Sequence, residues 1–245
     1  MEKTYYEAYA ELDRRNWWFT SRARIIEAVV RRWSPAKETG LVCDVGCGPT
    51  TTLSSLLSPS YNVVGLDVSP IAVEVARRHG RNAIECLSLS EYVSSGQKAD
   101  LILLLDVLEH VQDEASFLAE ICGALKPEGI LIMTVPAYAW LWSPHDEVNH
   151  HFRRYTRNQA LRTLKANGFE SVHSCYFNTF LFPLAAMKKL MDKLRGPSGA
   201  TDYNDRPPQW LNEILNAIFS SERWFVPWMG FPFGVSILAI AKKQK

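Results

Sequence analysis

Two carboxylates and two glycines in the first third of the chain have the types and spacing of a ligand site. Asp44 stands two residues before Gly46, and Gly48 completes a short turn. Glycine lets the backbone turn sharply and approach a ligand with no Cβ in the way. Asp67 lies 19 residues after Gly48, a spacing expected for a carboxylate that binds ribose hydroxyls. Since a carboxylate before the turn repels a pyrophosphate, the pattern predicts a ligand with a ribose and a positive charge.

These side chains need a parallel sheet to bring them together. Apolar runs at 41–45, 62–67, 82–86, 100–105 and 130–135 alternate with helix-compatible segments, which is typical of a doubly wound α/β fold. Ligands of such sheets bind at the carboxyl ends of the strands. A dinucleotide turn would have a third glycine at position 51, where this chain has Thr51. The sequence therefore argues against a dehydrogenase.

Four segments in this order resemble the class I S-adenosylmethionine-dependent methyltransferases. They are Asp44-Val45-Gly46-Cys47-Gly48, Asp67, Asp106-Val107-Leu108-Glu109-His110 and Leu125-Lys126-Pro127-Glu128-Gly129. One departure is Thr50, where many members have a third glycine. The resemblance implies a Rossmann-like, doubly wound, mostly parallel α/β sheet of seven strands in the order 3-2-1-4-5-7-6, with the last two strands near 169–177 and 234–242.

The resemblance also implies S-adenosylmethionine as the cofactor. It implies that Asp67 binds the ribose and that Asp106 faces the methionine part or the acceptor. Ser88 is a candidate for the adenine, although it would serve equally well as a helix cap, and His110 either orients the nearby turn or acts as a base. The full set of cofactor-binding candidates is Asp44, Gly46, Cys47, Gly48, Asp67, Val68, Ser88, Leu89, Asp106, Val107 and His110.

Residues 1–34 are predicted to form a helical lid, ahead of a methyltransferase domain at 35–245. A helix at 16–33 has an apolar stripe that includes Trp18, and Arg22 falls inside this stripe. In one interpretation Arg22 lays its stem on the core and extends its charge into water. In the other, supported by a resemblance to one bacterial branch of the family, Trp18 and Arg22 bind the acceptor.

Residues 140–155 form a dense polar segment with three histidines, two acids, two arginines and a tyrosine, predicted to be a loop beside the acceptor. In one interpretation a histidine removes a proton and an arginine binds an anionic acceptor. In a second, His145, Asp146, His150 and His151 bind a metal; in a third, the loop is held by salt bridges and has no chemical role. No regular ligand spacing is met, so we expect no metal. The catalytic candidates are His145, His150 and Tyr155, and the acceptor-binding candidates are Trp142, His151, Arg153 and Arg154.

About 55 residues, 178–233, separate the last two predicted strands, where the plain fold has a short hairpin. We expect a helical insertion with helices near 180–195 and from 207, joined by a mobile loop at 196–206. Its apolar stripes predict a cap on the core or a homodimer contact. The alternative is peripheral membrane contact through 180–231, because basic residues and tryptophans flank the apolar positions.

Composition narrows the class of protein further. The chain has 27 Lys and Arg against 26 Asp and Glu, and this balance argues against a nucleic-acid partner. Five cysteines with no CxxC pair are typical of a reducing compartment. The N-terminus is polar, and prolines and glycines interrupt the apolar stretch at 224–241, so we expect a cytoplasmic protein.

The sulfonium of the implied cofactor already activates its methyl group, so the protein need only place the acceptor and remove a proton. We therefore predict O-methylation of a hydroxyl or carboxylate on a small molecule, a natural product or a glycan- or lipid-linked acceptor. One alternative is N-methylation of an amino sugar or another amine, which needs no strong base. Another is a partner or regulator that binds S-adenosylmethionine and transfers no methyl group.

Overall fold

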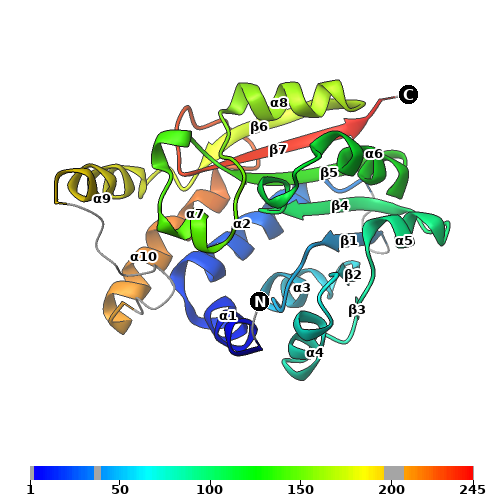
Figure 1. Cartoon of the computed structure of the whole chain (residues 1–245), viewed down its shortest axis with the longest axis horizontal. Coiled ribbons are helices and arrows are strands. Elements are labelled where there is room, and N and C mark those ends of the chain that lie inside the picture. Colours follow the sequence, from blue (N-terminus) through cyan, green and yellow to red (C-terminus); the bar gives the residue numbers. More distant parts are fainter. Residues whose placement is uncertain (1–2, 36–39, 196–206, 245) are drawn as a thin grey trace.

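The computed structural model describes residues 3–35, 40–195 and 207–244. Within them, one sheet has the strand order β3-β2-β1-β4-β5-β7-β6, which confirms the prediction (Figure 1). Strands β1 to β5 run parallel, and β7 is antiparallel to both β5 and β6. The strands are β1 Leu41–Val45, β2 Asn62–Leu66, β3 Ile84–Glu85, β4 Ala99–Leu105, β5 Leu125–Pro136, β6 Phe169–Phe177 and β7 Ser236–Lys243.

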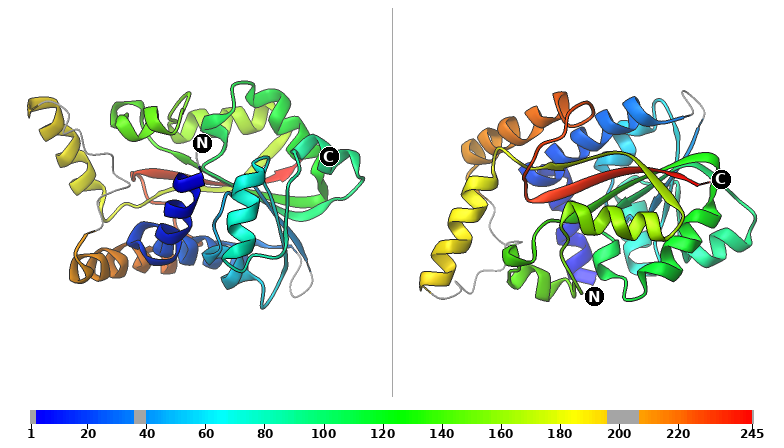
Figure 2. Two further views of the ribbon diagram at one scale, coloured as in Figure 1. Left: turned by 60° about the horizontal axis from the view of Figure 1, so that its bottom comes forward. Right: turned by 90° about the horizontal axis from the view of Figure 1, so that it is seen from above.

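Helices cover both faces of this sheet (Figure 2). Apolar side chains of α2 (Trp17–Trp33), α3 (Thr52–Leu57) and α10 (Gln209–Ser221) form a core with one face. Those of α5 (Leu89–Ser94), α6 (Glu114–Ala124) and α8 (Arg157–Ala166) form a core with the other. The central strand β4 contributes to both cores, which explains its uninterrupted apolar run.

Polar residues before the apolar stripes start several helices. The side chain of Asn16 accepts a hydrogen bond from the backbone of Trp18 at the start of α2. Ser69 caps α4 (Pro70–Arg78), with proline in the first turn. Ser88 and Thr156 form capping boxes with Glu91 and Gln159 at the starts of α5 and α8. The starts of these helices could therefore be predicted from the sequence.

The structure differs from the expected elements in several places, and β5, for example, begins at Leu125 and not near residue 130. The third strand is shorter than the predicted 82–86, and Cys86 beyond it is exposed. The predicted loop at 140–155 contains a helical turn, α7 (Pro144–Val148), because Ser143 and Asp146 form a capping box around Pro144.

The N-terminal residues form α1 (Lys3–Arg15) and α2, and the segment between β6 and β7 contains α9 (Phe182–Arg195) and α10. Helix α9 extends away from the sheet (Figures 1 and 2). The predicted mobile loop at 196–206 lies outside the described residues. Among the helices that are described, none combines the length and apolarity needed to span a bilayer.

Candidate active site

The glycine turn leads from β1 toward the carboxyl ends of the neighbouring strands. Gly46 and Gly48 have φ values of +67° and +57°, which residues with a side chain rarely adopt. The amides of Gly46 and Cys47 both donate to the carbonyl of Leu66 on β2, at 2.8 and 3.2 Å. A Cβ at Gly46 would lie 2.7 Å from Cγ2 of Val107, whereas one at Gly48 would meet nothing within 4 Å.

This difference makes the two glycines a matched pair for mutation. Both Gly46→Ala and Gly48→Ala force alanine into the left-handed region, at a cost of about 1–2 kcal/mol. Only Gly46→Ala also collides with Val107, so we expect it to weaken binding of a ligand at this turn by a further factor of about ten, or roughly 1.4 kcal/mol. Calorimetric titration of both variants measures this difference. Equal losses would show that the contact between Gly46 and Val107 does not shape the site.

Asp67 lies beside the turn, directly after β2. Its Oδ2 accepts from the amide of Gly48 at 2.8 Å, and its Oδ1 accepts from the amide of Ser69 at 2.9 Å. Burial raises the pKa of Asp67 despite these two hydrogen bonds. Each carboxylate oxygen keeps a lone pair for a further donor. Val68, the next residue, is 72% exposed and offers an apolar surface beside the carboxylate.

Other cofactor candidates have structural partners. Asp44 is buried and its Oδ2 lies 2.9 Å from Nη2 of Arg81, a residue that the sequence analysis did not select. Cys47 is buried, and burial raises the pKa of its thiol, so a reactive thiolate is not favoured. The hydroxyl of Ser88 is bonded to Glu91 in the capping box, and Leu89 is part of the core.

At the end of β4, Asp106 connects three elements. It has a φ of +56°, and its carboxylate accepts from Thr134 Oγ1 at 3.0 Å and pairs with Arg22 Nη2 at 2.7 Å. The guanidinium of Arg22 also lies over the ring of Trp18, 5.2 Å from its centroid. The charge of Arg22 therefore enters the site instead of extending into water. Helix α2 is fixed at the strand edge where ligands of this fold bind.

Asp146 is the centre of the polar segment. Its side chain is fully buried and accepts from Arg154 through both oxygens, at 2.7 and 2.9 Å, and from the amide of Ser143 at 2.8 Å. Oδ1 also lies 2.8 Å from Nδ1 of His151. Burial alone would raise the pKa of Asp146, but the hydrogen bonds from His151 and Arg154 hold it well below its usual value. Asp146 is therefore ionised at neutral pH.

This ionisation fixes the proton on His151. A carboxylate can only accept, so Nδ1 of His151 carries the hydrogen and donates it to Asp146. In the neutral ring the other nitrogen, Nε2, then has a free lone pair. A histidine oriented by a carboxylate in this way is the arrangement of a general base. The sequence analysis had placed His151 among the acceptor-binding residues.

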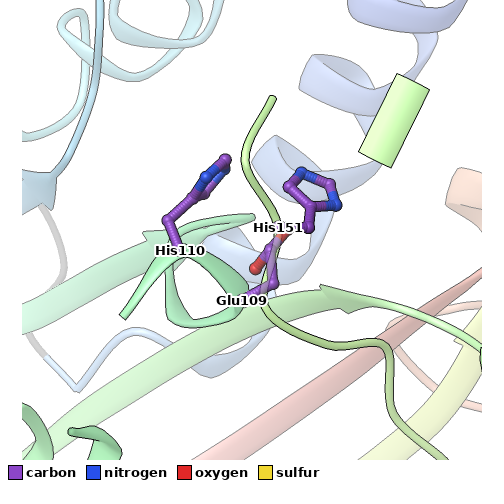
Figure 3. A group of neighbouring side chains, drawn as sticks. All are labelled: Glu109, His110 and His151. Carbon is purple, nitrogen blue, oxygen red and sulfur yellow. The ribbon is translucent and has the colours of Figure 1, made fainter. Parts of the chain in front are cut away.

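The side chains of Glu109, His110 and His151 lie close together (Figure 3), with one oxygen or nitrogen of each within 4.8 Å of the others. Glu109 is buried, and burial and the charge of Asp106 raise its pKa well above the ordinary value. Partial burial and the neighbouring His151 lower the pKa of His110. Groups of this composition can hold a metal ion. Two of the four residues weighed for a metal, Asp146 and His151, are paired with each other.

The remaining candidates of the polar segment point to different places. His145 is half-buried with its ring centroid 6.1 Å from that of His151, whereas His150 is exposed. Arg153 pairs with Glu114 at 2.6 Å, and the hydroxyl of Tyr155 donates to the same carboxylate at 2.7 Å from within the core. Burial and Glu114 raise the pKa of Tyr155. The carbonyl of Trp142 accepts from Lys189 of α9.

A family model described as a methyltransferase domain matches residues 17–174, more than half of the chain. The chain belongs to the S-adenosylmethionine-dependent methyltransferases. The structure of such a methyltransferase from Archaeoglobus fulgidus has a TM-score of 0.54 at 17% identity, covering 90% of this chain and 94% of that one. Magnesium protoporphyrin IX methyltransferase from Synechocystis with bound S-adenosylmethionine has a TM-score of 0.51 at 16% identity, covering 92% and 78%.

Curated relatives match parts of this methyltransferase. A ubiquinone biosynthesis O-methyltransferase of Methylobacterium is 33% identical over 92 residues, covering 36% of this chain and 37% of that protein. One from Methylocella silvestris is 31% identical over 163 residues, covering 58% and 62%. The chain therefore spans less than two thirds of the length of these relatives.

S-adenosylmethionine is the cofactor of this methyltransferase. The donor set fits it, because the free lone pairs of Asp67 suit ribose hydroxyls and the turn at Gly46 exposes backbone beside it. Glu109, Arg81 and the role of Asp146 were missed in the sequence. Glu109 lies inside a motif that was recognised, but nothing in the sequence indicates that its carboxyl is buried.

Proposed function

We propose that this methyltransferase methylates oxygen and that His151 is the base that accepts the proton of the acceptor hydroxyl. The proposal rests on one observation: Nδ1 of His151 lies 2.8 Å from the ionised carboxylate of Asp146. An amine acceptor would have little need of an oriented base, whereas a hydroxyl must lose its proton as it is methylated.

The cofactor supplies a methyl group that its sulfonium has activated. In our proposal Gly46 and Gly48 form its backbone cradle, Asp67 holds its ribose, and Val68 lies against its adenine. Asp106 would face its methionine part, together with Val107 and His110. These assignments place the transferred methyl group at the edge where β4 ends, near the three side chains of Figure 3.

The proton then has a defined route. The cofactor would supply the methyl group and keep the electron pair of the broken carbon–sulfur bond, while the acceptor hydroxyl would give its proton to Nε2 of His151. The imidazolium that results is stabilised by Asp146, to which its other nitrogen already donates. Arg154 keeps Asp146 ionised and in place through two hydrogen bonds. His151 returns its proton to water after the product leaves.

An acceptor with an apolar part, such as a lipid-linked one, is favoured by the surface of the insertion. Trp210, Trp224 and Trp228 are each more than 60% exposed, and α9 exposes the side chains of Leu184, Met187, Leu190 and Met191. The ammonium of Lys189 donates to the carbonyl of Trp142, so α9 contacts the polar segment beside the site. Exposed tryptophan with flanking lysine is typical of proteins that lie on a membrane.

The proposed reaction is tested with S-adenosylmethionine that carries a deuterated methyl group. We would offer a phenol, a sugar, a carboxylic acid, an amine and a polyprenyl alcohol in lipid vesicles, and locate the label by mass spectrometry. We expect the label on oxygen, with faster transfer to the vesicle-bound alcohol than to a short-chain analogue. Transfer to amines alone would contradict O-methylation, and cofactor binding with no product from any acceptor would favour a regulator.

A further inference from the structure

Asp44 and Arg81 form a buried ion pair directly beneath the cofactor turn. Asp44 lies on β1 and Arg81 in the loop that follows α4, and both are about 95% buried. Nη2 of Arg81 lies 2.9 Å from Oδ2 of Asp44. Burial of a lone charge is costly, so each of these two groups needs the other.

The guanidinium of Arg81 also holds the turn itself. Its Nη1 donates to the carbonyl of Thr50 at 2.9 Å, at the far end of the glycine turn. The backbone of β2 makes room for it, because a Cβ at Gly65 would lie 2.7 Å from Nη2 of Arg81. One side chain therefore joins the end of β1, the turn and β2. These are the three segments that must keep their geometry for the turn to face a ligand.

We infer that Asp44 and Arg81 are positioning residues: they form an ion pair with no net charge that fixes the cofactor turn. In this inference Asp44 does not contact the cofactor's positive charge. The carboxylate of Asp44 is oriented toward the guanidinium and is nearly inaccessible to a ligand. Recognition of the cofactor's ammonium and sulfonium then belongs to groups on the open side of the turn. This inference rests on the cofactor alone and is independent of the methylated atom and of His151.

Two ligands separate positioning from direct contact. S-adenosylhomocysteine carries the amino-acid ammonium, whereas methylthioadenosine lacks the whole amino-acid part. Replacing a residue that holds the turn lowers the affinity for both ligands by a similar factor. Replacing one that binds the ammonium lowers only the affinity for S-adenosylhomocysteine. Three variants are compared with the wild type by calorimetric titration, at a temperature well below each melting point: Asp44→Asn, Arg81→Gln and the double variant.

We expect each single variant to lower the affinity for both ligands by about tenfold or more, because it leaves a buried charge unpaired. The double variant removes both charges, and we expect it to bind S-adenosylhomocysteine within about threefold of the wild type. Arg77→Gln is the matched control, since among the described residues the side chain of Arg77 donates to the carbonyl of Ile84 and not to Asp44, and it should show no coupling to Asp44→Asn.

Direct contact predicts the opposite pattern. Asp44→Asn would then lower the affinity for S-adenosylhomocysteine and leave that for methylthioadenosine unchanged. The double variant would bind S-adenosylhomocysteine no better than Asp44→Asn does. Either result would overturn the inference. If one single variant does not fold, the other single variant tests positioning, and the double variant still tests direct contact, because loss of a contacting carboxylate would weaken binding of S-adenosylhomocysteine even when Arg81 is also replaced.

Discussion

Replacing His151 with alanine is expected to slow methyl transfer to a hydroxyl by about 10²–10⁴-fold, the usual contribution of a general base. Affinity for S-adenosylhomocysteine should change little, because the proposed cofactor contacts lie at the turn and at Asp67. The loss should appear in kcat, measured with the acceptor that the labelling experiment identifies. An amine acceptor, if one is used, should be methylated almost as fast by the variant.

His145 and His150 provide the comparison, since the sequence had made them the candidates for the base. His150 is exposed, and the ring of His145 lies 6.1 Å from that of His151, which is the ring that bonds to Asp146, so alanine at either position should cost much less. If His145→Ala or His150→Ala slows the reaction more than His151→Ala, the assignment of the base is wrong.

Replacing Asp146 with alanine is expected to destabilise the fold by about 3–5 kcal/mol, because it leaves Arg154 buried without its partner. Asp113→Ala is the matched control: Asp113 caps α6 on the surface, and its loss should cost about 1 kcal/mol. Urea denaturation measures both free energies of unfolding. Equal losses in the free energy of unfolding would show that the buried pair stabilises the fold no more than a surface helix cap does.

The same change should alter how stability depends on pH. The pKa of Asp146 is lowered in the folded chain, so its ionised form stabilises the fold at pH values above about 4, the ordinary pKa of aspartate. This contribution is lost as the pH falls further, toward the lowered pKa. The difference in stability between the wild type and Asp146→Ala should therefore shrink on acidification below that value.

The sequence was informative where function depends on local pattern. The glycine turn, Asp67 and Asp106 all follow apolar strands, and parallel strands bring their carboxyl ends to one edge. The sheet order could be predicted from the resemblance to a known family, and several helix starts from their capping residues. Gly46 and Asp67 could therefore be placed at the site from the pattern of residues around each of them.

Side-chain pairing inside the site could not be predicted. The partner of Asp44 is Arg81, 37 residues away, and nothing in the sequence near either residue indicates it. Which of three histidines meets Asp146 depends on α7, a helical turn in a segment that had been expected to be a loop. Likewise, the partner of Arg22 is Asp106, which is brought to it only by the packing of α2 on the sheet.

A crystal structure with S-adenosylhomocysteine tests the central claim most directly. We predict that the ribose hydroxyls bond to Asp67 and that the sulfur, where the methyl group was attached, faces the group of Glu109, His110 and His151. The acceptor would then reach the methyl group from the side of His151. A sulfur that faces away from this group, with His151 separated from it by protein, would contradict the account.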